Sequence, residues 1–249
     1  MIKYGLIGNP LGHSWSQQWF ESMFAREGID DGQYRPYERD SLAGLKVWVC
    51  DEGLEGFNVT IPYKEAVIAH LDHLDPVVKS IGAVNCVERR GTQLIGHNTD
   101  APAFASTLKP LLQPHHTAAL ILGSGGASKA VAYALKELGI DYVIVSRQPL
   151  QHPRAIGYDQ ARILAASHTL IINATPVGMS PNVSTSPWPH FDLLCSRHLC
   201  YDLIYNPPRT RFLTDAEARG AQICNGLAML ERQAQLSWDI WQRIECVNV

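Results

Sequence analysis

The stretch that decides the fold is residues 118–128, Ala-Ala-Leu-Ile-Leu-Gly-Ser-Gly-Gly-Ala-Ser. Its first five residues form an apolar run of the length of a buried strand, and glycines follow at once. A helical pattern then extends to Leu138, and a second apolar run begins at Tyr142. This order of strand, glycine-rich turn, helix and strand predicts one half of a dinucleotide-binding domain.

The glycine loop has the spacing G-x-G-G-A, because Ser128 stands where a third glycine would complete the longer G-x-G-x-x-G pattern. Gly123 permits the tight turn. Gly125 and Gly126 let backbone amides and the positive end of the helix approach a pyrophosphate, with Ala127 in the same turn. The alternative is a glycine-rich turn that binds no ligand.

The residues after the next strand indicate which dinucleotide is preferred. A carboxylate at this point would bind the ribose hydroxyls of NAD, whereas a cation accepts the 2′-phosphate of NADP. The strand ends in Val145-Ser146-Arg147, with no acid. Arg147 therefore predicts NADP. Arg154 is a second candidate cation, although an ordinary surface arginine is the simpler interpretation.

Short apolar runs alternate with helical patterns along the rest of the chain, which predicts an α/β protein of two domains. We expect residues 1–100 and 226–249 to form one domain with a mixed, mostly parallel sheet. Residues 101–225 are expected to form a Rossmann-like domain. The last helix carries Leu227, Leu230, Ala234, Trp238 and Trp241 on one stripe, so we expect it to fold back on the first domain and close a cleft between the two.

Composition excludes several classes of protein. The 249 residues include 21 Lys and Arg against 24 Asp and Glu, and this charge of −3 gives no basic field for nucleic acid. No apolar run approaches the roughly 18 residues of a membrane span, and no signal peptide is recognised. Six scattered cysteines read as reduced thiols, and no metal-ligand pattern is present. We therefore expect a cytoplasmic protein without a metal, either a monomer or a homodimer.

Polar residues of the first domain stand where its predicted strands end: Ser14 and Ser16, Asn58 and Thr60, Asn85, and Asn98-Thr99-Asp100. Ligands of open α/β sheets bind beyond the carboxyl ends of strands, so these hydroxyls and amides suit a small polyhydroxylated ligand. Each also has a structural interpretation. Ser14 is a good helix N-cap, Asn58 a turn residue, and Asn85 a partner for a buried backbone group.

Lys64 and Asp100 are the candidate catalytic pair. Pro62 suits the first turn of a helix that goes on to carry Ala66, Val67, Ala69, His70 and Leu71, so Lys64 is expected in the first turn of that helix. A cation there opposes the helix dipole at about 0.3–1 kcal/mol, so another reason for its presence is expected.

Several motifs resemble those of the shikimate dehydrogenase family. They are Ile7-Gly8-Asn9-Pro10, His13-Ser14-x-Ser16, Asn58-Val59-Thr60-Ile61-Pro62-Tyr63-Lys64-Glu65, Gly82-Ala83-Val84-Asn85, Asn98-Thr99-Asp100, Gly123-x-Gly125-Gly126-Ala127-Ser128, Asn173-Ala174-Thr175, Tyr201-Asp202-Leu203-x-Tyr205-Asn206-Pro207 and Gly226-Leu227-Ala228-Met229-Leu230 with Gln233. They occur in the family's order over nearly the whole chain.

The resemblance implies NADPH-dependent, reversible reduction of 3-dehydroshikimate to shikimate, a step of chorismate and aromatic amino-acid biosynthesis. It implies Lys64 as the acid/base and Asp100 as its partner. Substrate would be bound by Ser14, Ser16, Asn58, Thr60, Asn85, Tyr205 and Gln233. The cofactor would be bound by Gly123, Gly125, Gly126, Ala127, Ser146, Arg147, Thr175 and Gly226.

The chain departs from the family pattern at several positions. His97 replaces an Asp, Gln17 a Pro and Asn225 an Asp, Ala101-Pro102-Ala103 lacks the usual glycines, and Ser146-Arg147-Gln148 replaces Asn-Arg-Thr. Two alternatives stay open at this point: a related quinate/shikimate dehydrogenase with broader substrate or NAD use and, from another class, a non-catalytic binding protein that senses NADP or a metabolite. A methylene-tetrahydrofolate dehydrogenase shares the architecture, but the serine pair and Asn98-Thr99-Asp100 argue against it.

Overall fold

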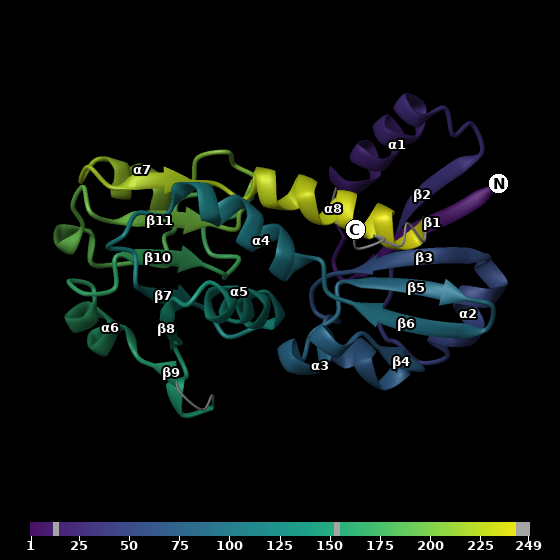
Figure 1. Cartoon of the computed structure of the whole chain (residues 1–249), viewed down its shortest axis with the longest axis horizontal. Helices are drawn as coiled ribbons and strands as arrows, with labels where there is room; N and C mark the ends of the chain where they lie inside the picture. Colours follow the sequence, from purple (N-terminus) through teal and green to yellow (C-terminus); the bar gives the residue numbers. More distant parts are fainter. Residues whose placement is uncertain (12–14, 152–154, 243–249) are drawn as a thin grey trace. The chain divides into compact units, whose positions relative to one another are not determined.

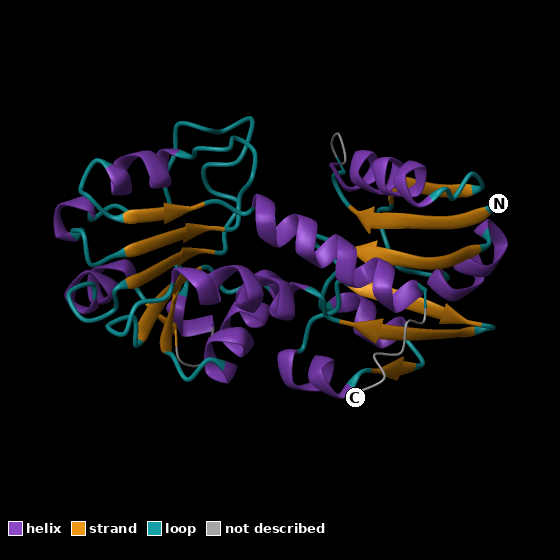
Figure 2. Ribbon diagram, turned by 45° about the horizontal axis from the view of Figure 1, so that its top comes forward, coloured by secondary structure: helices purple, strands orange, loops and turns teal. Residues whose placement is uncertain are grey.

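The structure is a computed structural model that describes residues 1–11, 15–151 and 155–242. The chain divides into two compact units, one formed by Met1–Thr99 with Glu231–Val249 and the other by Asp100–Leu230 (Figure 1). Each unit contains one sheet with helices packed against it (Figure 2), so the predicted α/β fold class is confirmed. In the part of the chain that the structure describes, no helix is both long enough and apolar enough to cross a membrane.

The first unit is built on a six-stranded sheet with the order β2-β1-β3-β5-β6-β4. Its elements are β1 (Ile2–Gly8), α1 (Trp15–Glu27), β2 (Gly32–Glu38), α2 (Leu45–Glu52), β3 (Leu54–Val59), the 3-10 helix η1 (Ala66–His70), β4 (His73–Leu74), α3 (Pro76–Ile81), β5 (Cys86–Arg90), β6 (Gln93–His97) and most of α8 (Leu227–Trp241). Strand β1 is parallel to β2 and β3, β4 is parallel to β6, and β5 is antiparallel to both β3 and β6.

Two apolar clusters hold this unit together, one on each face of its sheet. Helices α1 and α8 cover one face, where Phe20 and Trp241 pack with Tyr34 of β2. Helices α2 and α3 and the 3-10 helix η1 cover the other face around Phe57 and Val87. The prediction that the terminal helix packs on the N-terminal part of the chain is therefore confirmed.

The second unit contains a six-stranded, fully parallel sheet with the order β12-β11-β10-β7-β8-β9. Its elements are α4 (Asp100–Leu108), η2 (Lys109–Leu111), β7 (Ala118–Leu122), α5 (Gly126–Glu137), β8 (Asp141–Val145), η3 (Pro149–Gln151), β9 (Ala155–Ile156), α6 (Tyr158–Leu164), β10 (Leu170–Asn173), η4 (Phe191–Leu193), β11 (Leu199–Asp202), α7 (Arg211–Glu217) and β12 (Gln222–Cys224). Because all six strands are parallel, their carboxyl ends share one edge of the sheet.

Alternation along β11 shows how the two faces of this sheet are covered. The Tyr201 ring meets Phe104 of α4 edge to face at 5.1 Å, and its hydroxyl bonds Thr107 at 2.8 Å. Cys200, the preceding residue, instead joins the core under α6 and α7 with Phe212 and Trp188. Residues of β11 thus point alternately to two helical layers, as a sheet buried on both faces requires.

The structure corrects three local expectations. The helix expected after Pro62 is the short 3-10 helix Ala66–His70, and Lys64 lies in the turn before it. The predicted effect of a helix dipole on this lysine is therefore wrong. Leu227, placed on the apolar stripe of the last helix, is exposed. Helices α3, α6 and α7 were not anticipated, because six or seven residues are too few to show a helical period.

We predict that Trp241→Ala destabilises the first unit by about 3–5 kcal/mol, the usual loss for a large aromatic residue in a core. The indole stacks on Tyr4 at 4.7 Å, its Nε1 donates to the Val87 carbonyl at 3.0 Å, and it lies so close to Gly56 that a Cβ there would overlap it. Urea unfolding measures the change. Val47→Ala, on the exposed side of α2, is the control, and an equal loss in both variants would contradict the assigned packing.

Candidate active site

Asn58 is the centre of a buried polar cluster in the first unit. It lies near the end of β3, and its Oδ1 accepts a hydrogen bond from the Tyr34 hydroxyl at 3.0 Å. Its Nδ2 donates to the Asn85 carbonyl at 3.2 Å and to Ser237 Oγ at 2.8 Å. Both amide hydrogens are thus used inside the protein, and a substrate hydroxyl has only the Asn58 Oδ1 to bond.

Asn85 extends the cluster to the segment before Asp100. Its Nδ2 donates to Thr99 Oγ1 at 2.8 Å and to Gln233 Oε1 at 3.4 Å, while its Oδ1 accepts the Thr99 N–H at 2.7 Å. Ser237, four residues after Gln233 on α8, donates to the Gln233 carbonyl and lies 3.3 Å from Thr99 Oγ1. The structure therefore brings together Asn58, Asn85 and Gln233, which are remote in the sequence.

The other predicted residues of this unit surround the cluster. Ser16 hydrogen-bonds the Tyr34 hydroxyl, and burial raises the pKa of Tyr34 well above its ordinary value, so this phenol stays neutral and can donate to Asn58. Thr60 follows β3 directly, and its N–H donates to the Ile7 carbonyl at 2.9 Å. Ser14 lies outside the described residues.

Lys64 and Asp100 fall in different units. The Lys64 carbonyl accepts the Val84 N–H at 2.7 Å, which holds the lysine backbone one residue from Asn85. Asp100 directly follows Thr99, is buried, and is the first residue of α4. A carboxylate in the first turn of a helix is favoured by the helix dipole. The backbone of each residue is thus joined to a member of the polar cluster, by a hydrogen bond or by the chain.

The glycine loop lies at the carboxyl edge of the second sheet, between β7 and α5. Gly123 has φ +107°, and a Cβ there would stand 2.8 Å from Thr175 Cγ2. Its N–H donates to the Val145 carbonyl at 2.9 Å. Gly125 precedes α5 as its N-cap and has extended backbone, and a Cβ there would meet no described atom within 4 Å. The twelve-residue helix that starts at Gly126 therefore has a turn of small residues, completed by Ala127, at its N-terminus.

Ser146 and Arg147 follow β8, the strand beside β7. The Ser146 hydroxyl accepts the Gln148 N–H at 3.1 Å and so holds the turn after the strand. Arg147 is exposed. Burial raises the pKa of Tyr158, while the nearby Arg147 cation acts in the opposite direction. A cation thus stands one strand away from the glycine loop, as predicted, and Arg154 lies outside the described residues.

Thr175, Tyr205 and Gly226 lie beyond the ends of β10, β11 and β12. The Thr175 N–H and hydroxyl both donate to Asn173 Oδ1, at 2.9 and 2.7 Å. Burial raises the pKa of Tyr205, so its phenol is neutral at ordinary pH. Gly226 is buried so closely against the Leu203 backbone that a Cβ would overlap the Leu203 carbonyl. This glycine is therefore required by packing, whatever its part in cofactor binding.

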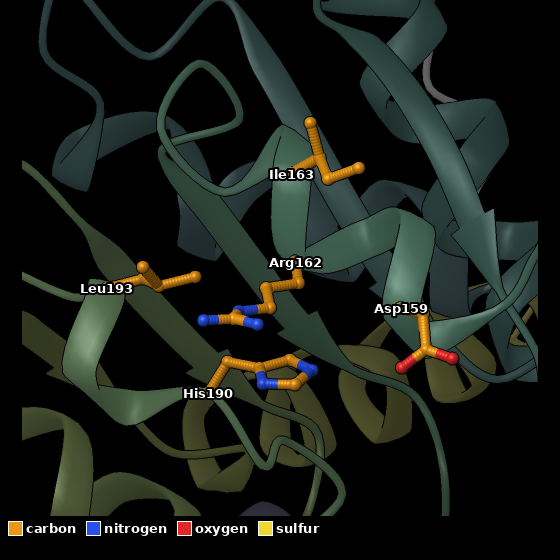
Figure 3. Close-up of a pocket in the computed structure, with 5 residues that line it drawn as sticks. All are labelled: Asp159, Arg162, Ile163, His190 and Leu193. Atoms are coloured by element: carbon orange, nitrogen blue, oxygen red, sulfur yellow. The ribbon is translucent and has the colours of Figure 1, made fainter.

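A surface pocket of about 440 Å³ lies elsewhere in the second unit (Figure 3). Asp159, Arg162 and Ile163 of α6 line it together with His190 and Leu193. Figure 3 shows the Arg162 and His190 side chains both lining this pocket. None of the predicted site residues lines this pocket. Among the described residues, no group of three His, Cys, Asp or Glu side chains is arranged to hold a metal ion.

The sequence analysis did not predict the buried residues that hydrogen-bond the amide side chains of the site. Ser237 and Tyr34 fix the Asn58 amide, and the buried Asp202 accepts a hydrogen bond from Asn173. One signal was available for Ser237: it is a polar residue between Ala234 and Trp238, on the apolar stripe of the last helix. Such a residue needs a buried partner.

Fold and site together define a two-domain α/β oxidoreductase of the dinucleotide-dependent class. The shikimate dehydrogenase substrate binding domain family matches residues 6–87. A shikimate dehydrogenase (NADP(+)) of Symbiobacterium thermophilum is 33% identical, over 95% of this chain and 87% of the relative. This chain belongs to the shikimate dehydrogenase family.

Solved structures agree with this assignment. Shikimate 5-dehydrogenase of Thermus thermophilus, in complex with NADP(H) and shikimate, superposes with a TM-score of 0.86 at 35% identity, covering 98% of this chain and 94% of that one. The ligand-free 5-ketofructose reductase of a Gluconobacter strain has a TM-score of 0.78 at 31% identity, covering 96% and 92%. The second neighbour shows that this fold also carries a protein named for another substrate.

We predict that Gly123→Ala lowers the free energy of unfolding by about 1–3 kcal/mol, because alanine must adopt a positive φ and its methyl must displace Thr175. Gly125→Ala is the matched control. Its backbone is extended and its Cβ has room, so its stability should stay within about 0.5 kcal/mol of the unchanged chain. Thermal unfolding compares the two, and equal losses would contradict the loop geometry.

Proposed function

We propose that this chain catalyses the reversible, NADPH-dependent reduction of 3-dehydroshikimate to shikimate, a step of chorismate and aromatic amino-acid biosynthesis. Membership of the shikimate dehydrogenase family supports this reaction. The observation that carries it is the hydrogen-bonded cluster of Asn58, Asn85 and Gln233 near Lys64, because a ring bearing several hydroxyls needs amide and hydroxyl partners at fixed positions.

In this proposal the first unit binds the substrate. Ser14, Ser16, Asn58, Thr60, Asn85 and Gln233 come from this unit, and Tyr205 comes from the second. Asn58 accepts a hydrogen bond from a ring hydroxyl through Oδ1, because its two amide hydrogens already bond Asn85 and Ser237. The internal bonds fix the side chain before substrate arrives, which reduces the entropy lost on binding.

Lys64 is proposed as the acid/base and Asp100 as the residue that orients it. Reduction of the ketone creates negative charge on oxygen, and the Lys64 ammonium both stabilises that charge and donates the proton from Nζ. The Asp100 carboxylate accepts a hydrogen bond from a neighbouring ring hydroxyl and orients the Lys64 ammonium group. In the direction of shikimate oxidation, neutral Lys64 removes the hydroxyl proton.

The second unit is proposed to hold NADP, and its glycine loop fits a pyrophosphate. Gly125 leaves space above the start of α5, where backbone N–H groups and the helix dipole favour an anion. Gly123, Gly126, Ala127, Ser146, Thr175 and Gly226 complete the site, and Arg147 pairs with the 2′-phosphate. When bound, NADPH supplies the hydride. The oligomeric state and the cytoplasmic location stay predictions from the sequence.

Absorbance of reduced nicotinamide tests the proposal. Purified protein is mixed with shikimate, quinate or reduced 5-ketofructose, each with NADP or NAD. The expected result is rapid reduction of NADP by shikimate. Rapid reduction of NADP by quinate, or rapid reduction of NAD, would instead support the broader dehydrogenase. A protein that binds NADP but turns over none of these compounds would contradict the proposal and favour a sensing role.

We predict that Lys64→Ala lowers kcat by about 10²–10⁴, the usual contribution of a general acid/base, with a small change in the KM for shikimate. Steady-state kinetics measures both parameters. Lys79→Ala, which removes an exposed lysine of α3 in the same unit, is the control and should retain full activity. An unchanged kcat in Lys64→Ala would remove this lysine from the mechanism.

We predict that Arg147→Ala raises the KM for NADP about 10- to 100-fold and leaves the KM for NAD nearly unchanged, because only NADP carries the 2′-phosphate. The ratio of the two KM values is the readout. Arg162→Ala removes another exposed arginine of the same unit, at the pocket of Figure 3, and should change neither value. Equal effects of Arg147→Ala on both cofactors would rule out contact with the 2′-phosphate.

A further inference from the structure

Asp202 is a fully buried carboxylate to which the proposed reaction assigns no role. It is the last residue of β11, and its side chain bonds Thr210, the N-cap residue of α7. Oδ1 accepts hydrogen bonds from Asn173 Nδ2 at 2.9 Å and from the Ile204 N–H at 3.0 Å. Oδ2 accepts the Thr210 hydroxyl at 2.6 Å. All three partners are donors, as an ionised carboxylate requires.

One of these hydrogen bonds leads to the glycine loop. Asn173 donates from Nδ2 to Asp202 and also to the Val177 carbonyl at 3.3 Å, so its Oδ1 must face the other way. That oxygen accepts the N–H and the hydroxyl of Thr175. The Thr175 methyl in turn fills the space beside Gly123, where a Cβ would stand 2.8 Å from it. Asp202 thus selects the amide orientation that holds Thr175 against the loop.

The second hydrogen bond fixes the backbone that leads into Tyr205. Ile204 donates its N–H to Asp202 and accepts the Gly226 N–H at 3.0 Å through its carbonyl. Tyr205 is the next residue. The third hydrogen bond fixes Thr210, whose hydroxyl also accepts the Leu213 N–H and so caps α7. One carboxylate therefore joins the segments after β10 and β11 to the start of α7.

We propose that Asp202 is a positioning residue that assembles the cofactor side of the active site, with Asn173 orienting Thr175 at the glycine loop and Ile204 orienting Tyr205. This inference rests on the proposed function for the identity of the ligand, NADP. Asp202 itself contacts neither cofactor nor substrate in this assignment, because its oxygens are used by Asn173, Ile204 and Thr210.

Ionisation of Asp202 provides a readout that a purely structural role would not give. Burial raises its pKa to about 6, against the pull of its three donors. Cys200, on the same strand, has a thiol pKa that burial, and secondly the Asp202 charge, raises far above the ordinary value, so this thiol stays neutral. Below about pH 6 the Asp202 carboxyl gains a proton and accepts hydrogen bonds more weakly. The affinity for NADP should therefore fall.

Stability should change with pH in the opposite direction. The folded-state pKa lies above the ordinary aspartate value, so the folded chain binds the extra proton between about pH 4 and pH 6. The contribution of Asp202 to stability is therefore largest at low pH and is lost as pH rises to about 6. A purely structural residue would instead make binding and stability change together.

The test measures NADP binding by calorimetry from pH 5 to pH 8 in the unchanged chain and in two variants. Asp202→Ala should weaken NADP binding at pH 7.5 by about 10-fold or more, as expected when hydrogen bonds to a charged group are lost. Asp202→Asn keeps the shape, should fold with at least equal stability at pH 7.5, and should weaken binding by several-fold. The ratio of its affinity to that of the unchanged chain cancels the titration of the cofactor's own phosphate.

Cys200→Ala is the matched control, since Cys200 is buried on the same strand and the same face but donates to none of these residues. The proposal is overturned if Asp202→Ala weakens NADP binding no more than Cys200→Ala. If Asp202→Ala does not fold, the Asp202→Asn variant provides the test. The proposal is overturned if this variant binds NADP with the same affinity, and with the same dependence of affinity on pH, as the unchanged chain.

Binding and turnover are measured separately, so the two proposals fail separately. A chain that binds NADP through Asp202 but does not oxidise shikimate would contradict the proposed function alone. A chain that oxidises shikimate while its Asp202 variants bind NADP normally would contradict the positioning role alone.

Discussion

A buried asparagine amide at the end of a central strand is the constraint on which both units depend. Asn58 is the penultimate residue of β3 and Asn173 is the last residue of β10, and neither can remain buried unless its donors and acceptor are all satisfied. Tyr34 and Ser237 satisfy Asn58, whereas Asp202 and Val177 satisfy Asn173. Each amide then has one orientation, and that orientation determines where the neighbouring polar groups lie.

This arrangement explains why the supporting residues come from distant parts of the chain. Ser237 lies on the terminal helix, and Trp241 packs that helix against the first sheet. This packing places the Ser237 hydroxyl within hydrogen-bond distance of Asn58. Asp202 costs desolvation free energy that an apolar residue would avoid, and the pKa of about 6 reflects that cost. A protein selected for stability alone would not retain it, which is consistent with a role in ordering the loops.

Long periodic segments and glycine-rich turns could be predicted from the sequence. The strand at 118–122 was predicted because it is an unbroken apolar run followed by glycines, and the helix after Gly126 and the final helix were predicted from their helical patterns. The turn before Ala66 was predicted as a helix because Pro62 suits a first turn, but the backbone continues only as a 3-10 helix of five residues. The amide clusters could not be predicted, because hydrogen bonds between residues as distant as Asn58 and Ser237 leave no local pattern.

The most direct test of this account is a crystal structure of the chain with NADP and shikimate bound. The account predicts a shikimate hydroxyl donating to Asn58 Oδ1, the reacting hydroxyl within hydrogen-bond distance of Lys64 Nζ, and the pyrophosphate at the start of α5, with the Asn58 and Asn173 amides oriented as they are without ligands. Either amide turned over, or shikimate bound away from Asn58 and Lys64, would contradict it.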